Sequence, residues 1–143
     1  MQRIPNWLSV SLLVVGGLVW QTISPAAEPH QLSAQSPSHS VALLELYTSE
    51  GCNSCPAADT WVSSLSERGF RSDRVIPLAL HVDYWDYLGW PDRFAQAIFT
   101  QRQRAIATQH RSRTIYTPQL VLHGKDLRDR HTFEQQLQQI NDT

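Results

Sequence analysis

Nearly continuous apolar runs alternate along the chain with segments whose apolar residues recur at helical spacing. The runs at residues 41–48 and 75–82 are typical of strands that are covered on both faces. Residues 119–123 predict a third strand, and residues 127–128 predict a short fourth strand. Pro77 removes one main-chain donor from the second run, so we expect this strand at an edge of the sheet.

Three helical regions lie between or after these strands. Residues 52–68 predict the first helix, with Gly69 as its C-terminal stop. A helical stretch starting at residues 90–92 is expected to break at Thr100, where capping-box spacing predicts a further helix to about residue 109. The last helix is expected from a capping box and an apolar stripe, formed by Thr132 with Gln135 and by Phe133, Leu137 and Ile140.

The expected order of elements is therefore β-α-β-α-β-β-α. Such alternation independently indicates an α/β sheet with parallel crossovers. This is also the minimal order of a thioredoxin-like fold, in which the second strand lies at a sheet edge. We therefore expect a central mixed β-sheet flanked by helices, with a helical insertion between the second and third strands.

The N-terminal segment resembles an export signal. Arg3 supplies a basic region, and residues 8–20 are mostly apolar, the size of a signal-peptide core. Small residues at 24–26 fit a cleavage site, so residues 1–26 are interpreted as a signal peptide. The alternative is an uncleaved N-terminal anchor, because residues 4–23 just reach the length of about 20 that a spanning helix needs.

Removal of this segment leaves one domain. Residues 27–40 are expected to be a flexible lead-in and residues 41–143 a thioredoxin-like domain. Without Arg3, the chain has 11 of its 12 basic residues and 13 acidic residues. This near balance of charge excludes nucleic acid and anionic membrane surfaces as partners. The membrane is a partner only through the N-terminal segment, if it is uncleaved. We expect an exported protein, periplasmic or extracellular, in an oxidising compartment.

Cys52 and Cys55 are the only two cysteines, and they follow the first strand in a C-x-x-C arrangement. This spacing after a strand is the local layout of thioredoxin-like redox proteins. Cys52 is the expected attacking thiolate, since a helix N-terminus favours negative charge, and Cys55 is the expected buried resolving thiol. The alternative is a static disulfide, although so small a ring constrains the unfolded chain weakly.

Two further candidates flank the cysteine pair in a thioredoxin-like fold. In such proteins a cis-proline before the third strand packs against the cysteines and presents the preceding backbone to substrate. Thr117 and Pro118 occupy this place, and the context favours the cis isomer. Glu45, the lone charge of the first strand, is expected either as a buried proton acceptor for the resolving thiol or as a solvent-facing residue.

Charged and aromatic residues crowd the loop after the second strand. Tyr84 and Trp85 are candidates for a substrate groove, with packing over the insertion as the alternative. His81, Asp83 and Asp86 are expected mainly to order this loop. His81 is also a candidate for proton transfer or for metal binding, because active sites of α/β sheets gather at the C-terminal ends of strands.

Four segments carry a resemblance to a known family, residues 45–56, 81–90, 99–104 and 116–119. They resemble exported, thioredoxin-like bacterial proteins catalogued as domain of unknown function 1223, over about residues 41–124. The resemblance implies a thioredoxin-like fold. It implies no substrate, because none is established for this family. Members typically continue into a further C-terminal region, so the resemblance also implies a short or truncated member.

Three classes of function follow. The first is a thiol–disulfide oxidoreductase that acts on exported proteins or small thiols and has a redox-active disulfide in place of a separate cofactor. The second is a copper-handling protein that uses Cys52 and Cys55 with His81 or His123. The third is a non-catalytic binding module. The Asn53-Ser54 dipeptide matches neither reducing nor strongly oxidising pairs, so the direction of electron flow stays open.

Overall fold

A four-stranded mixed sheet lies at the centre of the computed structural model, which describes residues 35–143. The expected signal peptide or anchor at residues 1–26, and most of the lead-in, lie outside the described residues. Within residues 35–143, no helix combines the length and the apolar character needed to cross a membrane. The elements are β1 (Ala42–Thr48), α1 (Pro56–Ser63), β2 (Val75–His81), η1 (Asp86–Leu88), α2 (Ala97–Gln109), β3 (Gln119–Leu122), β4 (Lys125–Asp126), η2 (Arg130–Thr132) and α3 (Phe133–Asn141).

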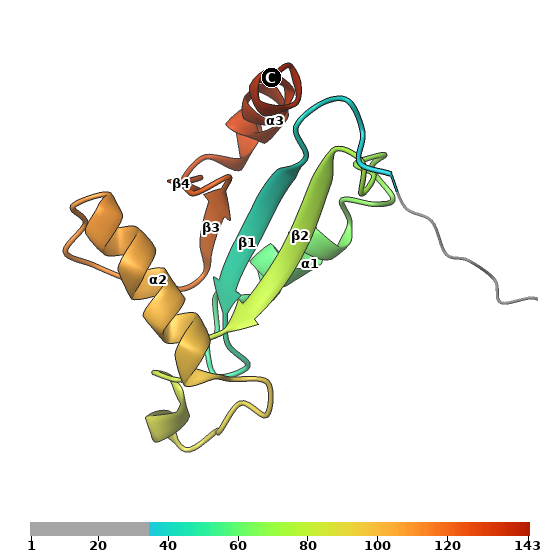
Figure 1. The fold of residues 1–143 in the computed structure, drawn as a ribbon. Helices are drawn as coiled ribbons and strands as arrows, with labels where there is room; N and C mark the ends of the chain where they lie inside the picture. Colours follow the sequence, from blue (N-terminus) through green and yellow to red (C-terminus); the bar gives the residue numbers. More distant parts are fainter. Residues whose placement is uncertain (1–34) are drawn as a thin grey trace, which may run out of the picture. The chain divides into compact units, whose positions relative to one another are not determined.

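The strands are ordered β2-β1-β3-β4 (Figure 1). β1 pairs in parallel with β2, from Ala42 opposite Val75 to Thr48 opposite His81. β3 runs antiparallel to β1 and to β4. β2 therefore lies at an edge, as Pro77 predicted, and β1 is hydrogen-bonded along both sides.

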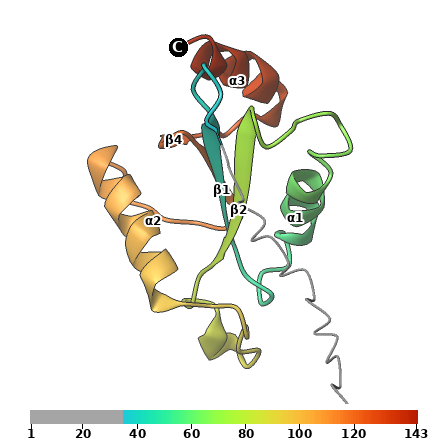
Figure 2. The ribbon, with the colours of Figure 1, turned by 45° about the vertical axis from the view of Figure 1, so that its right-hand side comes forward.

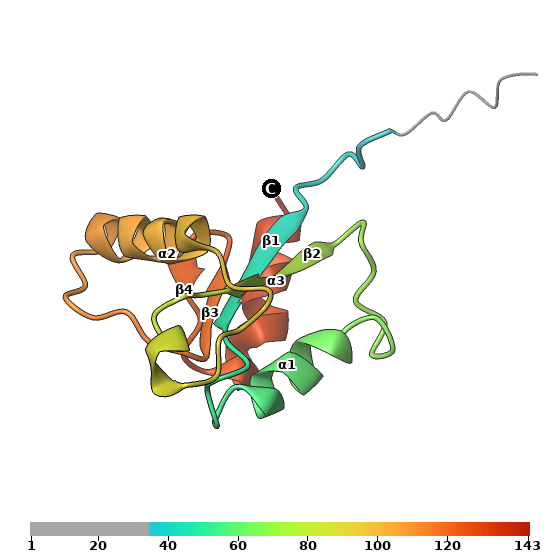
Figure 3. The same ribbon diagram turned by 90° about the horizontal axis from the view of Figure 1, so that it is seen from below.

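Helices cover both faces of the sheet. Figure 2 and Figure 3 show α2 on one side of the strands and α1 and α3 on the other. Alternate residues of β1 point to opposite faces. Leu44 and Leu46 belong to the core beneath α1 and α3, whereas Tyr47 belongs to a smaller core that includes Phe99 and Ile106 of α2.

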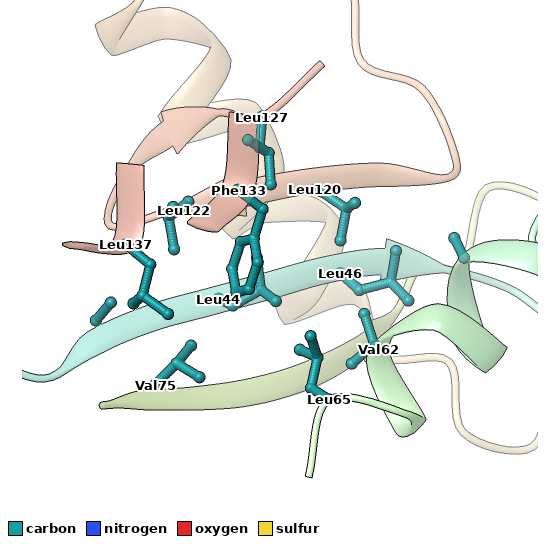
Figure 4. Close-up of a cluster of buried hydrophobic side chains, with 12 residues drawn as sticks. Leu44, Leu46, Val62, Leu65, Val75, Leu120, Leu122, Leu127, Phe133 and Leu137 are labelled. Carbon is teal, nitrogen blue, oxygen red and sulfur yellow. The ribbon is translucent and has the colours of Figure 1, made fainter. Parts of the chain in front are cut away.

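The larger core joins β1 and β3 to α1 and α3 (Figure 4). Phe133 is fully buried there, and its ring packs edge-on against Trp61 and Phe70 at centroid distances of 5.1 and 5.2 Å. The buried members of this core are Ala42, Leu44, Leu46, Ala58, Val62, Leu65, Val75, Leu120, Leu122, Leu127, Phe133 and Leu137.

The first helix is shorter than residues 52–68. The helix begins at Pro56, because the residues before it, up to the N-cap Cys55, form a turn. It ends at Ser63, and the next hydroxyl, that of Ser64, donates to the Trp61 carbonyl oxygen at 2.8 Å. A serine that bonds its own backbone in this way competes with regular helix, which the apolar pattern did not reveal.

Gly69 closes the turn that follows α1 and is not the stop of the helix, because α1 already ends at Ser63. Its φ is +87°, and its N–H donates to the Ser66 carbonyl oxygen at 3.1 Å. The Phe70 N–H reaches back to the Leu65 carbonyl oxygen at 2.9 Å. This pair of bonds around a left-handed glycine is a Schellman motif.

The insertion differs from its prediction. No helix starts at residues 90–92, and α2 runs unbroken from Ala97 through Thr100 to Gln109. The Thr100 hydroxyl does not cap a helix, because it donates to the Asp83 carboxylate at 2.6 Å and accepts the Asp83 N–H at 3.2 Å. Residues 90–96 are held outside a helix by the side chain of Asp92, described below.

The fourth strand lies at Lys125–Asp126, ahead of the expected residues 127–128. His123 and Gly124 have φ values of +48° and +82°, as the two central residues of a type I′ turn require. This turn pairs Leu122 directly with Lys125, which brings the return strand forward.

The capping box expected at the last helix is not formed. The Thr132 hydroxyl donates to the Asp129 carbonyl oxygen at 2.7 Å and accepts a bond from Gln136, while the expected partner was Gln135. The apolar stripe of α3 is confirmed, since Phe133 and Leu137 are buried and Ile140 packs against the core.

Phe133→Ala is expected to lower the free energy of unfolding by about 3–5 kcal/mol, because it empties a fully buried ring site. Urea unfolding at equilibrium measures this change. Gln135→Ala, at an exposed position of the same helix, is the matched control and should stay within about 0.5 kcal/mol of wild type. Equal losses in the two variants would contradict the packing described here.

Candidate functional site

Cys52 and Cys55 form a disulfide in the turn between β1 and α1, with their Cα atoms 5.4 Å apart. Cys55 is the N-cap of α1, and its carbonyl oxygen accepts the N–H groups of Ala58 and Asp59 at 2.8 and 3.0 Å. Both cysteines are buried, at 2% and 0% exposure, whereas the sequence predicted burial of Cys55 alone. The hydroxyl of Ser54 lies 3.5 Å from the Cys52 sulfur.

Pro118 lies beside the cysteine turn, as the sequence predicted. The Thr117–Pro118 peptide bond is cis. Pro118 lines one surface pocket of about 390 Å³ together with Ser54 of the cysteine turn and Ala57 of α1. The loop before β3 and the turn after β1 therefore form one site.

Trp85 joins this site from the loop after β2. Its indole N–H donates to the Thr117 hydroxyl at 2.7 Å. A Cβ atom at Gly51 would lie 3.3 Å from the Cβ of Trp85, so the cysteine turn also approaches this side chain closely. Within residues 35–143, the N–H and carbonyl of Thr117 make no backbone hydrogen bond. The backbone of this half-buried residue thus takes no part in the sheet.

Tyr84 lies between the insertion and the loop before β3, where its hydroxyl also interacts with the Thr117 side chain. Its side chain packs in the core on the α2 side, and its hydroxyl donates to Gln103 at 3.2 Å. Burial raises the pKa of the Tyr84 hydroxyl above its ordinary value. The structure thus places Tyr84 in packing over the insertion, which was the alternative in the sequence analysis.

Gln103 positions the loop before β3, a role that the sequence analysis missed. This buried side chain on α2 donates to the Tyr116 carbonyl oxygen and to the Gln119 side chain, both at 2.8 Å. It lies one turn after Thr100, and the two are buried on the same face of the helix. That spacing was interpreted as a capping box, although it also fits two polar residues on a buried face.

Glu45 is buried at 1% exposure, and the solvent-facing alternative is wrong. Its carboxylate accepts a hydrogen bond from Arg102 of α2 and lies 3.5 Å from the Tyr47 hydroxyl. These partners lie on the α2 side of the sheet, whereas Leu44 and Leu46 point toward α1. The structure therefore does not bring Glu45 together with the cysteines.

Asp59 is an acidic side chain on the α1 side that the sequence analysis passed over. It lies in the first turn of α1 and accepts a hydrogen bond from the Thr48 hydroxyl at 3.2 Å. A carboxylate near a helix N-terminus is favoured by the helix dipole, which is the signal that could have drawn attention to it.

The buried carboxylate of Asp92 connects the aromatic loop to the cysteine turn. It accepts the Glu50 N–H at 2.8 Å, the Phe94 N–H at 2.8 Å and the His81 Nδ1 at 2.6 Å. The Asp92 N–H donates to the Asp86 carboxylate at 3.0 Å. His81 and Asp86 thus order the loop, as predicted, and Asp92 at its centre was not identified from the sequence.

Burial alone would raise the pKa of Asp92. Hydrogen bonds from the Glu50 N–H, the His81 ring and the Phe94 N–H outweigh burial, because they stabilise the carboxylate form. The pKa of Asp92 therefore lies below its ordinary value.

The copper alternative lacks a third ligand in the described part of the chain. Among residues 35–143, no three side chains of His, Cys, Asp or Glu are grouped closely enough to hold a metal ion. His81 is directed to Asp92, and the His123 ring lines a pocket with Glu45 and Arg102 on the α2 side. Neither histidine joins the cysteine pair.

Comparison with known proteins places the chain in a family. The family model "Protein of unknown function (DUF1223)" matches residues 43–143. The chain belongs to this family. A search of curated proteins found no match.

One solved structure is similar to the chain. It is the crystal structure of a protein from Agrobacterium tumefaciens, with 36% sequence identity and a TM-score of 0.62. The similarity covers 72% of this chain and 46% of that one. The chain thus matches less than half the length of its relative.

Gln103→Ala is expected to destabilise the protein by about 1–3 kcal/mol, because it leaves the half-buried Tyr116 carbonyl and the buried Gln119 side chain without this donor. Urea unfolding measures the loss. Gln101→Ala, exposed on the same helix, is the control and should change stability by no more than about 0.5 kcal/mol. The proposed role of Gln103 fails if both variants unfold like wild type.

The lowered pKa of Asp92 predicts a specific loss of stability in acid. The unfolded chain takes up a proton near the ordinary pKa of 3.8, while folded Asp92 takes it up only at lower pH. This contribution is complete above pH 3.8 and is lost as pH falls through the folded pKa. Asp92→Asn should therefore show a shallower decline of unfolding free energy below about pH 4 than wild type.

Urea unfolding between pH 3 and pH 7 tests this prediction. Asp142→Asn removes the same charge at an exposed position and should keep the acid dependence of wild type. A decline of equal steepness in Asp92→Asn and wild type would show that Asp92 does not contribute to it.

Proposed function

We propose that this protein is a thiol–disulfide oxidoreductase with a thioredoxin-like fold. The observation that carries the proposal is the Cys52–Cys55 disulfide in the turn before α1, with the cis-proline Pro118 beside this turn. Cysteines at this spacing after a strand are typical of thioredoxin-like redox motifs.

The topology supports the thioredoxin-like assignment. β1 and β2 are parallel, β3 and β4 return antiparallel, and a helix follows. Helices on both faces leave the C-terminal end of β1 free for the cysteine turn. Active sites of open α/β sheets gather at this end of their strands.

The reaction is an exchange of two electrons between the cysteine pair and a substrate. A substrate thiolate attacks the Cys52 sulfur, the Cys52–Cys55 bond breaks, and Cys55 leaves as a thiolate that takes up a proton. A second substrate thiolate then attacks the substrate sulfur of the mixed disulfide and releases the Cys52 thiolate. The substrate leaves as a disulfide, and the same steps in reverse reduce a substrate disulfide.

Cys52 is the proposed point of attack because its sulfur lies next to a side chain that lines the pocket. Ser54 lines the pocket, and its hydroxyl lies 3.5 Å from the Cys52 sulfur. Cys52 is 2% exposed, so a substrate reaches its sulfur only after local displacement of the cysteine turn. The dipole of α1, whose N-terminus lies at Cys55, then favours the thiolates that form.

The proposed compartment and the proposed substrates of the protein are inferred from its sequence. The resemblance of residues 1–26 to a signal peptide supports export to a periplasmic or extracellular space. In such a space a cysteine pair is kept oxidised or is catalytic. The proposed substrates are exported proteins or small thiols.

A non-catalytic binding module is a second candidate, favoured by a cluster of exposed apolar side chains on the loop after β2. Tyr87 is 82% exposed, Trp90 64%, Leu88 54% and Phe94 51%. Such clusters often mark sites of protein–protein contact. If this is the function, a double Cys52→Ser/Cys55→Ser variant will retain partner binding.

Cys55→Ala is expected to accumulate mixed disulfides through Cys52, because the resolving thiol is missing. Non-reducing electrophoresis and mass spectrometry of the exported fraction measure these adducts, which reductant should release. Cys52→Ala is the matched control and should accumulate far fewer adducts. Absence of adducts in Cys55→Ala would favour a static structural disulfide.

A further inference from the structure

The pocket beside Pro118 has an apolar floor and a basic rim. Ala58, Leu120 and Leu127 line it from below, and their side chains are 5%, 7% and 3% exposed. The charged residues that line it are Arg128 and Arg130, both exposed to solvent. Among the described residues, no acidic side chain lines this pocket.

Contacts outside the pocket hold the two arginines in place. The Arg128 Nε donates to the Asp126 carboxylate at 2.9 Å, and within residues 35–143 its terminal nitrogens have no protein partner. Asp126 also accepts the Tyr116 hydroxyl at 2.8 Å, which fixes the carboxylate beside Arg128. The Arg130 guanidinium lies over the Trp61 ring, 5.8 Å from its centroid. Arg128 is thus paired with Asp126. Within residues 35–143, Arg130 has no ion-pair partner and gives the rim its unpaired positive charge.

One residue of the pocket, Ser54, lies next to the Cys52 sulfur. Ser54 and Pro118 both line the pocket, and the Ser54 hydroxyl lies 3.5 Å from that sulfur, although neither cysteine lines the pocket itself. A ligand that occupies the pocket therefore lies near the position of attack, next to Ser54. Its volume, about 390 Å³, suits one or two amino-acid residues rather than a folded surface.

We propose that this pocket selects thiol and disulfide substrates that carry a carboxylate close to the reacting sulfur. The carboxylate pairs with Arg128 and Arg130, whose planar guanidinium groups match carboxylate geometry. The aliphatic part of the ligand covers Leu120 and Leu127. The inference rests on the proposed function, and a peptide cysteine flanked by acidic residues shares this chemistry with glutathione.

Three peptide disulfides test the selection, identical except that Asp, Asn or Lys precedes the single cysteine. In the assay the reduced Cys52 thiolate attacks one peptide sulfur, and a peptide thiolate leaves and takes up a proton. Cys55 then attacks Cys52 and releases the second peptide thiol, so two electrons pass from the protein to the peptide disulfide. Chromatography of the released thiols gives the rate constants, each divided by that for dithiothreitol to remove intrinsic reactivity.

The Asp peptide should react at least about threefold faster than the Asn peptide, and the Lys peptide more slowly, as exposed ion pairs of this kind allow. The difference should shrink in 1 M salt, where the screening length is about 3 Å. Arg128→Gln/Arg130→Gln should abolish the preference, and Arg128→Glu/Arg130→Glu should turn it toward the Lys peptide. The reversal is a gain that a misfolded variant cannot give.

Arg71→Gln/Arg104→Gln removes the same charge from exposed positions outside this pocket and should keep the wild-type preference. Equal rates for the three peptides, or an unchanged preference in Arg128→Gln/Arg130→Gln, would overturn the proposal. A comparison of glutathione disulfide with its carboxyl-methylated ester distinguishes small thiols from acidic peptides as the source of the carboxylate. A faster free acid supports small thiols as substrates, and equal rates leave acidic peptides as the source.

A binding assay separates this inference from the proposed function. The same peptides with serine in place of cysteine are titrated against the oxidised protein and followed by fluorescence anisotropy. Selective binding of the Asp peptide without any thiol exchange would support the pocket and overturn the oxidoreductase. Exchange without charge selectivity in either assay would retain the oxidoreductase and overturn the pocket.

Discussion

The burial of β1 is the constraint on which the rest of the structure depends. This strand is hydrogen-bonded to β2 on one side and β3 on the other, and helices cover both of its faces. Its one charged side chain, Glu45, is therefore removed from water and must be paired, which Arg102 of α2 accomplishes. The same strand ends at the cysteine turn, so the strand that is paired on both sides leads directly to the disulfide.

Polar side chains, more than apolar packing, hold the loops around the C-terminal end of β1. Asp92 binds the backbone ahead of Cys52 to the loop after β2, and Trp85 binds this loop to Thr117. Gln103 fixes the other side of the Thr117 loop from α2. Each of these contacts joins segments distant in sequence, so one set of polar contacts connects all three loops.

The strands and the edge position of β2 follow from local patterns, and this part was predictable from the sequence. Their signals lie in adjacent residues, as in the continuous apolar run of β1. The loop contacts were not predictable, because Asp92 acts on the Glu50 N–H 42 residues away and Gln103 on the Tyr116 carbonyl 13 residues away. Glu45 shows the same limit. Its burial was an open alternative, but which face of the sheet it occupies depends on where α2 packs.

These contacts also bear on why the chain keeps a disulfide. In the chain-entropy model a four-residue ring restricts the unfolded state by only about 2 kcal/mol, less than the roughly 3 kcal/mol of a 15-residue ring. The cysteine turn is moreover already fixed by the Glu50–Asp92 hydrogen bond before it and by α1 after it. A cross-link is thus placed where the fold needs little extra restraint. Opening the disulfide at this position therefore costs the folded protein little stability. A disulfide that is broken and re-formed in turnover requires this property.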